Sequence, residues 1–147
     1  MTAVGIVRHP AGREALRVLL SAAESADSLG VVELELEPGG SGPPLHVHPT
    51  HDEGFYVLAG ELTVRVGDDV VAGGPGTWAF APRDVPHTLG NLGSATVRLL
   101  ATFSPGGFER RFERILAELS GAPLPEMSPA QLATQRVGPP LAPGGAS

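Results

Sequence analysis

Residues 40–60 read Gly-Ser-Gly-Pro-Pro-Leu-His-Val-His-Pro-Thr-His-Asp-Glu-Gly-Phe-Tyr-Val-Leu-Ala-Gly, and this stretch carries most of the recognisable chemistry of the chain. In a β-strand successive side chains point to opposite faces, so His46 and His48 project the same way. Glu53 stands five positions beyond His48, a spacing that would reverse its direction in an unbroken strand. Pro49 predicts a turn, because proline fixes φ and cannot donate a ladder hydrogen bond, and after the turn Glu53 points back at the histidines.

Two imidazoles and one carboxylate suit a first-row divalent ion, namely iron, manganese, nickel, copper or zinc. The chain has no cysteine, so any metal would be held by nitrogen and oxygen, and no disulfide can form. This composition fits a cytoplasmic location, which we expect. The apolar run at residues 3–7 is too short for a secretory signal, and no run reaches the length of a membrane span, so we expect no membrane partner.

Length and composition predict a single all-β domain. A chain of 147 residues is enough for one core. Its 20 glycines and 15 prolines fall mostly between apolar runs, as in a domain of short strands joined by tight turns. The formal charge of −6 would repel phosphates, and no basic cluster offsets it, so we expect no nucleic-acid partner.

Alternating apolar and polar positions predict a series of short strands. In residues 29–36, for example, Val32, Leu34 and Leu36 alternate with glutamates, which indicates one buried and one solvated face. Residues 16–22 are interpreted as a first strand, although their surroundings also suit a helix by propensity. Further strands are predicted at residues 55–58, 62–66, 69–72, 77–81 and 96–103. About eight strands with regular turns are typical of a closed barrel or a two-sheet jelly roll.

The two histidine-bearing segments together resemble the two motifs of the cupin superfamily. Residues 40–60 match the first motif through Gly40, His46, His48, Glu53 and Gly60. The second motif is matched in residues 76–91, by the residues Gly76, Pro82, His87 and Asn91.

One position departs from the second motif, because Asp84 stands where cupins have glycine. Aspartate tolerates the left-handed backbone conformation better than most residues, so we expect altered loop detail without loss of the site.

The resemblance implies a fold, a domain division and a ligand set. The fold is an all-β double-stranded β-helix, or jelly-roll cupin barrel, with a short C-terminal helical extension. The divisions are a lead-in with the first strand (residues 1–28), the barrel (29–104), the helical extension (105–137) and a flexible tail (138–147). The implied metal ligands are His46, His48, Glu53 and His87. We expect His51, in the turn, to face solvent, and Asn91 to stabilise a turn.

The extension has helical periodicity. Apolar residues recur at helical spacing in residues 108–119, and Ser128-Pro129-Ala130-Gln131 predicts a capping box that starts a second helix ending near residue 137. The apolar face of the first helix suits packing in the core or a dimer, or alternatively a lid over the barrel. The segment Ser-Pro-Gly-Gly-Phe-Glu at residues 104–109 is similar to one in small single-domain bacterial cupins (cupin type 2) that resemble quercetin dioxygenase.

Two classes of function follow. The first is a metal-dependent, dioxygenase-like oxidoreductase acting on a small apolar or aromatic molecule held near Phe55, Phe80 and Phe103, with Glu53 as a general base if it swings off the metal. In this reading a redox-active ion is essential, whereas zinc would allow only Lewis-acid or structural roles. The alternative is a non-catalytic module that binds a small molecule, or a structural dimer with a vestigial metal site. Cupins commonly pair through sheet edges, and an exposed first strand such as residues 16–22 would need such cover, so we expect a homodimer.

Overall fold

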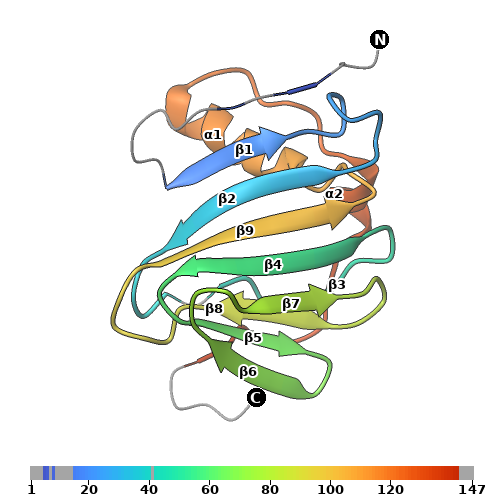
Figure 1. Ribbon diagram of the computed structural model, residues 1–147. Helices are drawn as coiled ribbons and strands as arrows, with labels where there is room; N and C mark the ends of the chain where they lie inside the picture. The colour runs from blue at the N-terminus through green and yellow to red at the C-terminus, as the bar shows by residue number, and fades with distance from the viewer. Residues whose placement is uncertain (1–4, 7, 9–14, 41, 143–147) are drawn as a thin grey trace.

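Two five-stranded antiparallel sheets form the body of the protein (Figure 1). The computed structural model describes residues 5–6, 8, 15–40 and 42–142. Within them lie the strands β1 (Leu16–Leu20), β2 (Gly30–Leu36), β3 (His46–Val47), β4 (Asp52–Ala59), β5 (Leu62–Val66), β6 (Asp69–Gly73), β7 (Trp78–Ala81), β8 (His87–Gly90), β9 (Val97–Ser104) and β10 (Gln135–Arg136). Two helices, α1 (Arg110–Ser120) and α2 (Pro129–Ala133), follow β9.

The strand order shows why two distant histidine segments meet. One sheet has the order β1-β2-β9-β4-β7 and the other β10-β3-β8-β5-β6, so β3 and β4 are consecutive in the chain but belong to different sheets. The turn between them, predicted from Pro49, carries the chain from one sheet to the other. In the second sheet His46 of β3 lies opposite His87 of β8. The predicted all-β double-stranded β-helix is confirmed.

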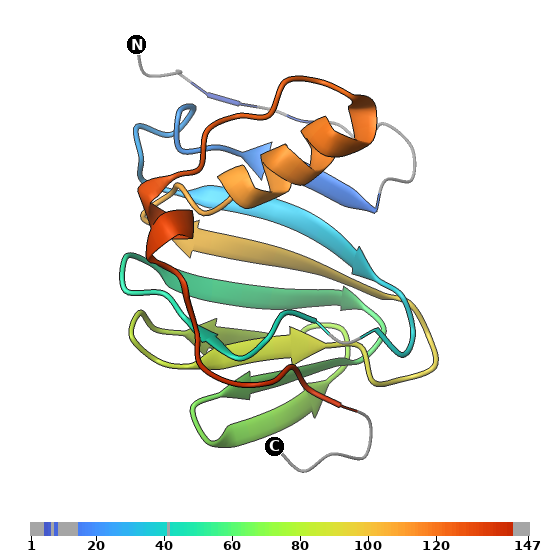
Figure 2. The ribbon, with the colours of Figure 1, turned by 180° about the vertical axis from the view of Figure 1, so that it is seen from behind.

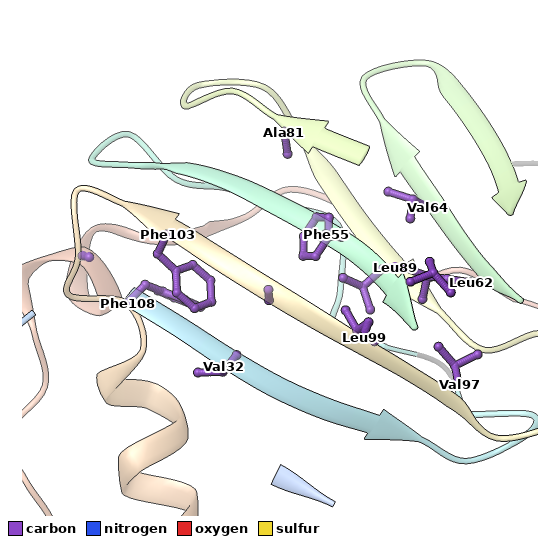
Figure 3. Close-up of a cluster of buried hydrophobic side chains, with 13 residues drawn as sticks. Val32, Phe55, Leu62, Val64, Ala81, Leu89, Val97, Leu99, Phe103 and Phe108 are labelled. Atoms are coloured by element: carbon purple, nitrogen blue, oxygen red, sulfur yellow. The ribbon is translucent and has the colours of Figure 1, made fainter. Parts of the chain in front are cut away.

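The core lies between the sheets and follows the alternation of β9. This strand is flanked by β2 and β4, and its residues Val97, Leu99, Ala101 and Phe103 are buried while the residues between them are partly exposed. Figure 3 shows Phe103 beside Phe108 at one end of the cluster and Leu99 near Leu62 and Leu89 at the other. The buried alternate positions of β9 thus contribute to one apolar core between the two sheets.

The C-terminal extension returns to the barrel as both helix and strand. Figure 2 shows α1 lying along β1 and β2, and the segment after α2 descending across the strands to the lower sheet. The predicted capping box is present, with the Ser128 hydroxyl accepting from the Gln131 amide N–H and the Gln131 side chain accepting from the Ser128 N–H. The prediction that this helix reaches residue 137 is wrong. It ends at Ala133, because Thr134 is extended (φ −64°, ψ 129°) and the chain then forms β10.

The residues after β10 are also fastened to the barrel. The N–H groups of Val137 and Gly138 donate to the Leu45 carbonyl, and Leu141 is buried. The expectation of a loose tail therefore does not hold for residues 138–142, whereas residues 143–147 lie outside the described part. None of the helices in the described residues is long and apolar enough to cross a membrane.

Candidate metal centre

Four side chains from three segments converge between the sheets. His46 lies on β3, His48 follows it, Glu53 is the second residue of β4, and His87 begins β8. One ligand atom from each lies within 4.8 Å of all the others. These are the four residues that the cupin resemblance implied, and the structure brings all of them together. His48, Glu53 and His87 are almost fully buried, and His46 is half-buried.

Hydrogen bonds fix the tautomers of two of the histidines. Nδ1 of His46 lies 2.7 Å from the Pro44 carbonyl, and Nδ1 of His87 lies 3.0 Å from the Val85 carbonyl. A carbonyl oxygen only accepts, so each Nδ1 must carry the proton. In the neutral rings this leaves the lone pair on Nε2, the atom available to a metal.

The third histidine is fixed by the C-terminal extension. The Thr134 hydroxyl donates to the Ala130 carbonyl at 2.8 Å, so its oxygen accepts from Nδ1 of His48 at 2.9 Å. The lone pair of His48 is therefore again on Nε2. Sequence reasoning missed Thr134, because it lies 86 residues from His48 and no motif spacing connects the two.

The carboxylate of Glu53 and the imidazole nitrogens lie so close together that a positive charge between them would stabilise the site. Oε2 of Glu53 lies 2.5 Å from Nε2 of His87 and 3.0 Å from Nε2 of His48, and this last atom is buried without a hydrogen-bond partner among the described residues. Lone pairs that face a carboxylate this closely repel it unless a proton or a cation lies between them. The donor set and the orphaned His48 nitrogen both fit a divalent metal ion.

The pKa values of Glu53, His87 and His46 are shifted by burial and by the closeness of these groups to one another. Burial raises the pKa of Glu53, but His48 and His87 lower it by more, so the pKa lies well below its ordinary value. Burial lowers the pKa of His87, yet the hydrogen bond to Glu53 and the charge of Glu53 outweigh burial, and the pKa is raised. Burial lowers the pKa of His46 to about 4. The site thus favours an ionised carboxylate and a neutral His46, the forms that bind metals.

His51 does not face solvent, and the expectation that it would is wrong. Its ring is 1% exposed and packs against His48 and Phe108, with ring centroids 4.3 Å and 5.1 Å away. Burial, followed by the charge of His48, lowers its pKa to about 4. The turn after Pro49 is folded inward under Phe108, a contact made by the extension and invisible in the local sequence. His51 is not one of the four clustered residues.

A cavity of about 600 Å³ opens onto the four-residue site. His46, Glu53 and His87 lie in its wall, and most of the remaining wall is apolar. Phe112 and Ile115 of α1 also line it, so the helix covers part of the cavity in addition to packing on the barrel.

Two of the three phenylalanines predicted near the substrate line this cavity. Phe55 and Phe103 do so, whereas Phe80 does not and is 50% exposed. The register explains the error. On β7 Ala81 lies opposite Glu53 and Phe80 opposite Gly54, so Phe80 points to the outer face. Residues 78–81 are apolar throughout, and alternation could not assign their faces from sequence.

Two residues of the second motif have the structural roles expected of them: Asp84, which replaces the usual glycine, and Asn91. Asp84 has a left-handed φ of 67°, and its N–H donates to the His48 carbonyl at 2.9 Å. Asn91 is buried, and its side chain donates to the carbonyls of Leu36 and Ala95 and so holds the turn before β9.

Comparisons with known proteins agree with this geometry. Residues 32–103 match the cupin domain family. A tetracenomycin polyketide synthase protein, TcmJ of Streptomyces glaucescens, is 30% identical over 97 residues, which make up 66% of this chain and 64% of TcmJ. The chain therefore aligns with slightly less than two thirds of that relative.

Two solved structures show the same fold. The crystal structure of TT1209 from Thermus thermophilus is 29% identical and superposes with a TM-score of 0.55 over 67% of this chain and 90% of that one. A predicted oxalate decarboxylase from Thermotoga maritima is 25% identical, with a TM-score of 0.58 over 61% and 78%. The protein belongs to the cupin superfamily, and its four clustered His and Glu side chains could bind a metal ion.

Proposed function

We propose that this cupin is a metal-dependent, dioxygenase-like oxidoreductase acting on a small apolar or aromatic molecule. The observation that carries the proposal is the shared wall: three of the four clustered side chains line the same cavity as Phe55 and Phe103. A substrate in this cavity would stand beside the metal. One divalent ion would be bound by His46, His48, Glu53 and His87.

The size and lining of the cavity support a compact apolar substrate. About 600 Å³ lies within the range of pockets that enclose small organic molecules. Phe103 and Phe112 are stacked at 6.0 Å and present aromatic surface on one side. When bound, a redox-active ion would supply the electron transfer that a reaction with dioxygen requires, whereas zinc would supply only Lewis acidity.

Glu53 is the proposed general base. Among the described residues that line the cavity it is the one carboxylate, and it is ionised because its pKa is lowered. It would accept a proton from a substrate hydroxyl or enol that reaches the site. With the ion bound, Nε2 of His87 would face the metal, so coordination to the ion would hold Glu53 in place until it leaves the ion to act as the base.

The likeness to TcmJ guides the choice of substrates. That protein is described as part of a polyketide synthase, so polyketide-type phenols and enols belong in the assay beside flavonols. No single activity is common to the names of the similar proteins, so the substrate is sought by direct assay.

Oxygen uptake tests the proposal. Untagged protein loaded in turn with iron, nickel, manganese, copper or zinc is assayed in an oxygen electrode against flavonols and polyketide-type phenols. A dioxygenase should consume oxygen and substrate in equal amounts with at least one redox-active metal, and His48→Ala should abolish the uptake. Ligand-dependent thermal shifts without turnover under every metal would instead support the alternative, a non-catalytic binding module.

We further propose a homodimer that pairs through β7. This strand is an edge of its sheet, and its outward side chains Trp78 and Phe80 are 54% and 50% exposed. Unpaired edge strands with exposed apolar residues are normally covered. We propose that a second copy of the chain packs against β7, because cupins commonly pair at sheet edges.

A further inference from the structure

The cavity beside the four-residue site has an unusual distribution of charge. Among the described residues, its wall contains one carboxylate, Glu53, which is buried, and two guanidinium groups, those of Arg111 and Arg136, which are exposed. The arginines therefore stand at the solvent side of the cavity and the carboxylate at its inner end. In a chain of net charge −6, this rim is locally cationic.

Backbone register brings Arg136 to the site. In the antiparallel pair of β10 with β3, Arg136 lies directly opposite His46. Side chains of directly opposed residues lie on the same face of a sheet. Arg136 and His46 therefore share the face that borders the cavity, with the longer arginine side chain reaching toward the mouth.

Arg111 approaches from the other side. It lies in the first turn of α1, the helix whose Phe112 and Ile115 also line the cavity. The next residue back, Arg110, belongs to the same turn but does not line this cavity. The helix thus directs one of two adjacent arginines to the cavity.

In the part of the chain that the structure describes, the side chains of the two cavity arginines have no polar partner. No hydrogen bond or ion pair joins the guanidinium group of Arg111 or Arg136 to another described residue. By contrast, Arg83 pairs with Asp52 at 3.2 Å and Arg98 with Glu33 at 3.1 Å. The two arginines at the cavity mouth retain their full capacity to bind an anion.

We propose that the molecule bound in this cavity is an organic carboxylate, with its apolar body against Phe55 and Phe103 and its carboxylate at Arg111 and Arg136. A guanidinium presents a planar fork of N–H donors that matches two carboxylate oxygens, and it loses less hydration than an ammonium group on pairing. The inference rests on the proposed function in one respect, that this cavity is where the substrate binds. It names the class of that substrate.

The two arginines favour the mouth as the place where the anion binds. In the metal-free protein a carboxylate at the inner end would face Glu53, whose negative charge opposes it, whereas at the mouth it meets two positive charges. The arginines would also attract the anion against the overall negative charge of the protein, which makes binding dependent on salt.

A matched pair of ligands tests the inference. The probes are 2-naphthoate and its neutral analogue 2-naphthamide, titrated calorimetrically into the wild-type protein, the double variant Arg111→Gln/Arg136→Gln and the control Arg110→Gln. Wild type and control should bind the acid about tenfold more tightly than the amide, the size expected for charge-assisted hydrogen bonds. The double variant should lose this preference and keep its affinity for the amide.

Metal-free and zinc-loaded samples separate this inference from the proposed function. The arginines are present in both, so their effect should appear without metal. If metal binding or oxygen uptake fails but the arginine-dependent preference persists, the substrate class stands and the dioxygenase proposal falls. Equal affinity for acid and amide, a preference that survives in the double variant, or no binding of either probe at millimolar concentration would overturn the inference.

Discussion

The Thr134 side-chain oxygen lies 2.9 Å from Nδ1 of His48, so a residue of the C-terminal extension orients a candidate metal ligand of the barrel. The same hydroxyl donates to Ala130 in α2, which fixes the direction of the interaction. The extension therefore contacts the candidate metal centre as well as covering part of the cavity.

Thr134→Val should weaken metal binding by about tenfold to a hundredfold, the usual effect of removing a partner that orients a ligand. Valine has a similar volume but leaves the His48 N–H buried without an acceptor. Competition against a chromogenic chelator measures the affinity. Thr134→Ser, which keeps the hydroxyl, serves as control, and equal affinities for all three proteins would contradict the role assigned to Thr134.

The chain should bind its metal through four residues and not five. His51→Leu removes a buried imidazole whose Nε2 has no hydrogen-bond partner among the described residues, so it should leave one metal ion per chain. Its thermal unfolding temperature without metal should not fall, because an apolar side chain suits the site beside Phe108. His87→Ala, by comparison, should lose the metal. Loss of metal in His51→Leu would show that the ligand set has been assigned wrongly.

Glu109 should be a major anchor of the extension. It is buried, and its carboxylate accepts from the backbone N–H groups of Ala22 and Gly107 at 2.5 Å and 2.6 Å. Glu109→Ala should lower the free energy of unfolding by about 2–4 kcal/mol, because two partly buried N–H donors lose their charged acceptor. Urea unfolding measures the change. Glu118→Ala, at an exposed position of the same helix, should alter it by less than about 0.5 kcal/mol.

A loss of stability in Glu109→Ala no greater than in the Glu118 control would mean that the extension is held mainly by its apolar contacts.

The proposed homodimer is tested at its exposed edge. Trp78→Glu places a charge on the outer face of β7 and should convert the dimer to a monomer in light scattering, because a buried unpaired charge opposes association. Leu119→Glu, at an 80% exposed position of α1, should leave the dimer intact. A wild-type monomer, or a dimer unaffected by Trp78→Glu, would exclude pairing through β7.

The sequence predicted those parts of the site that depend on local spacing. His46 and His48 are two apart, the Pro49 turn redirects Glu53, and Asp84 adopts the left-handed conformation that its place in the motif requires. Alternation is a short-range rule, and it identified the strands of the core, including β2 and β9.

The errors and omissions all involve contacts between distant segments. His51 is buried by Phe108, Thr134 reaches the site from the end of α2, and Arg136 reaches it through the short strand β10. Two residues are too few to show an alternation, and the capping box at Ser128 predicts where a helix starts but not where it ends. The face of Phe80 depended on pairing between β7 and β4, which a uniformly apolar segment does not reveal.

The most direct test of the account is elemental analysis of untagged protein, alongside the variants His46→Ala and His87→Ala. We predict close to one equivalent of a first-row transition metal per wild-type chain and a large loss in both variants. A wild-type protein that contains no metal, and takes up none when supplied with each ion in turn, would contradict the assignment of the four clustered side chains as a metal centre.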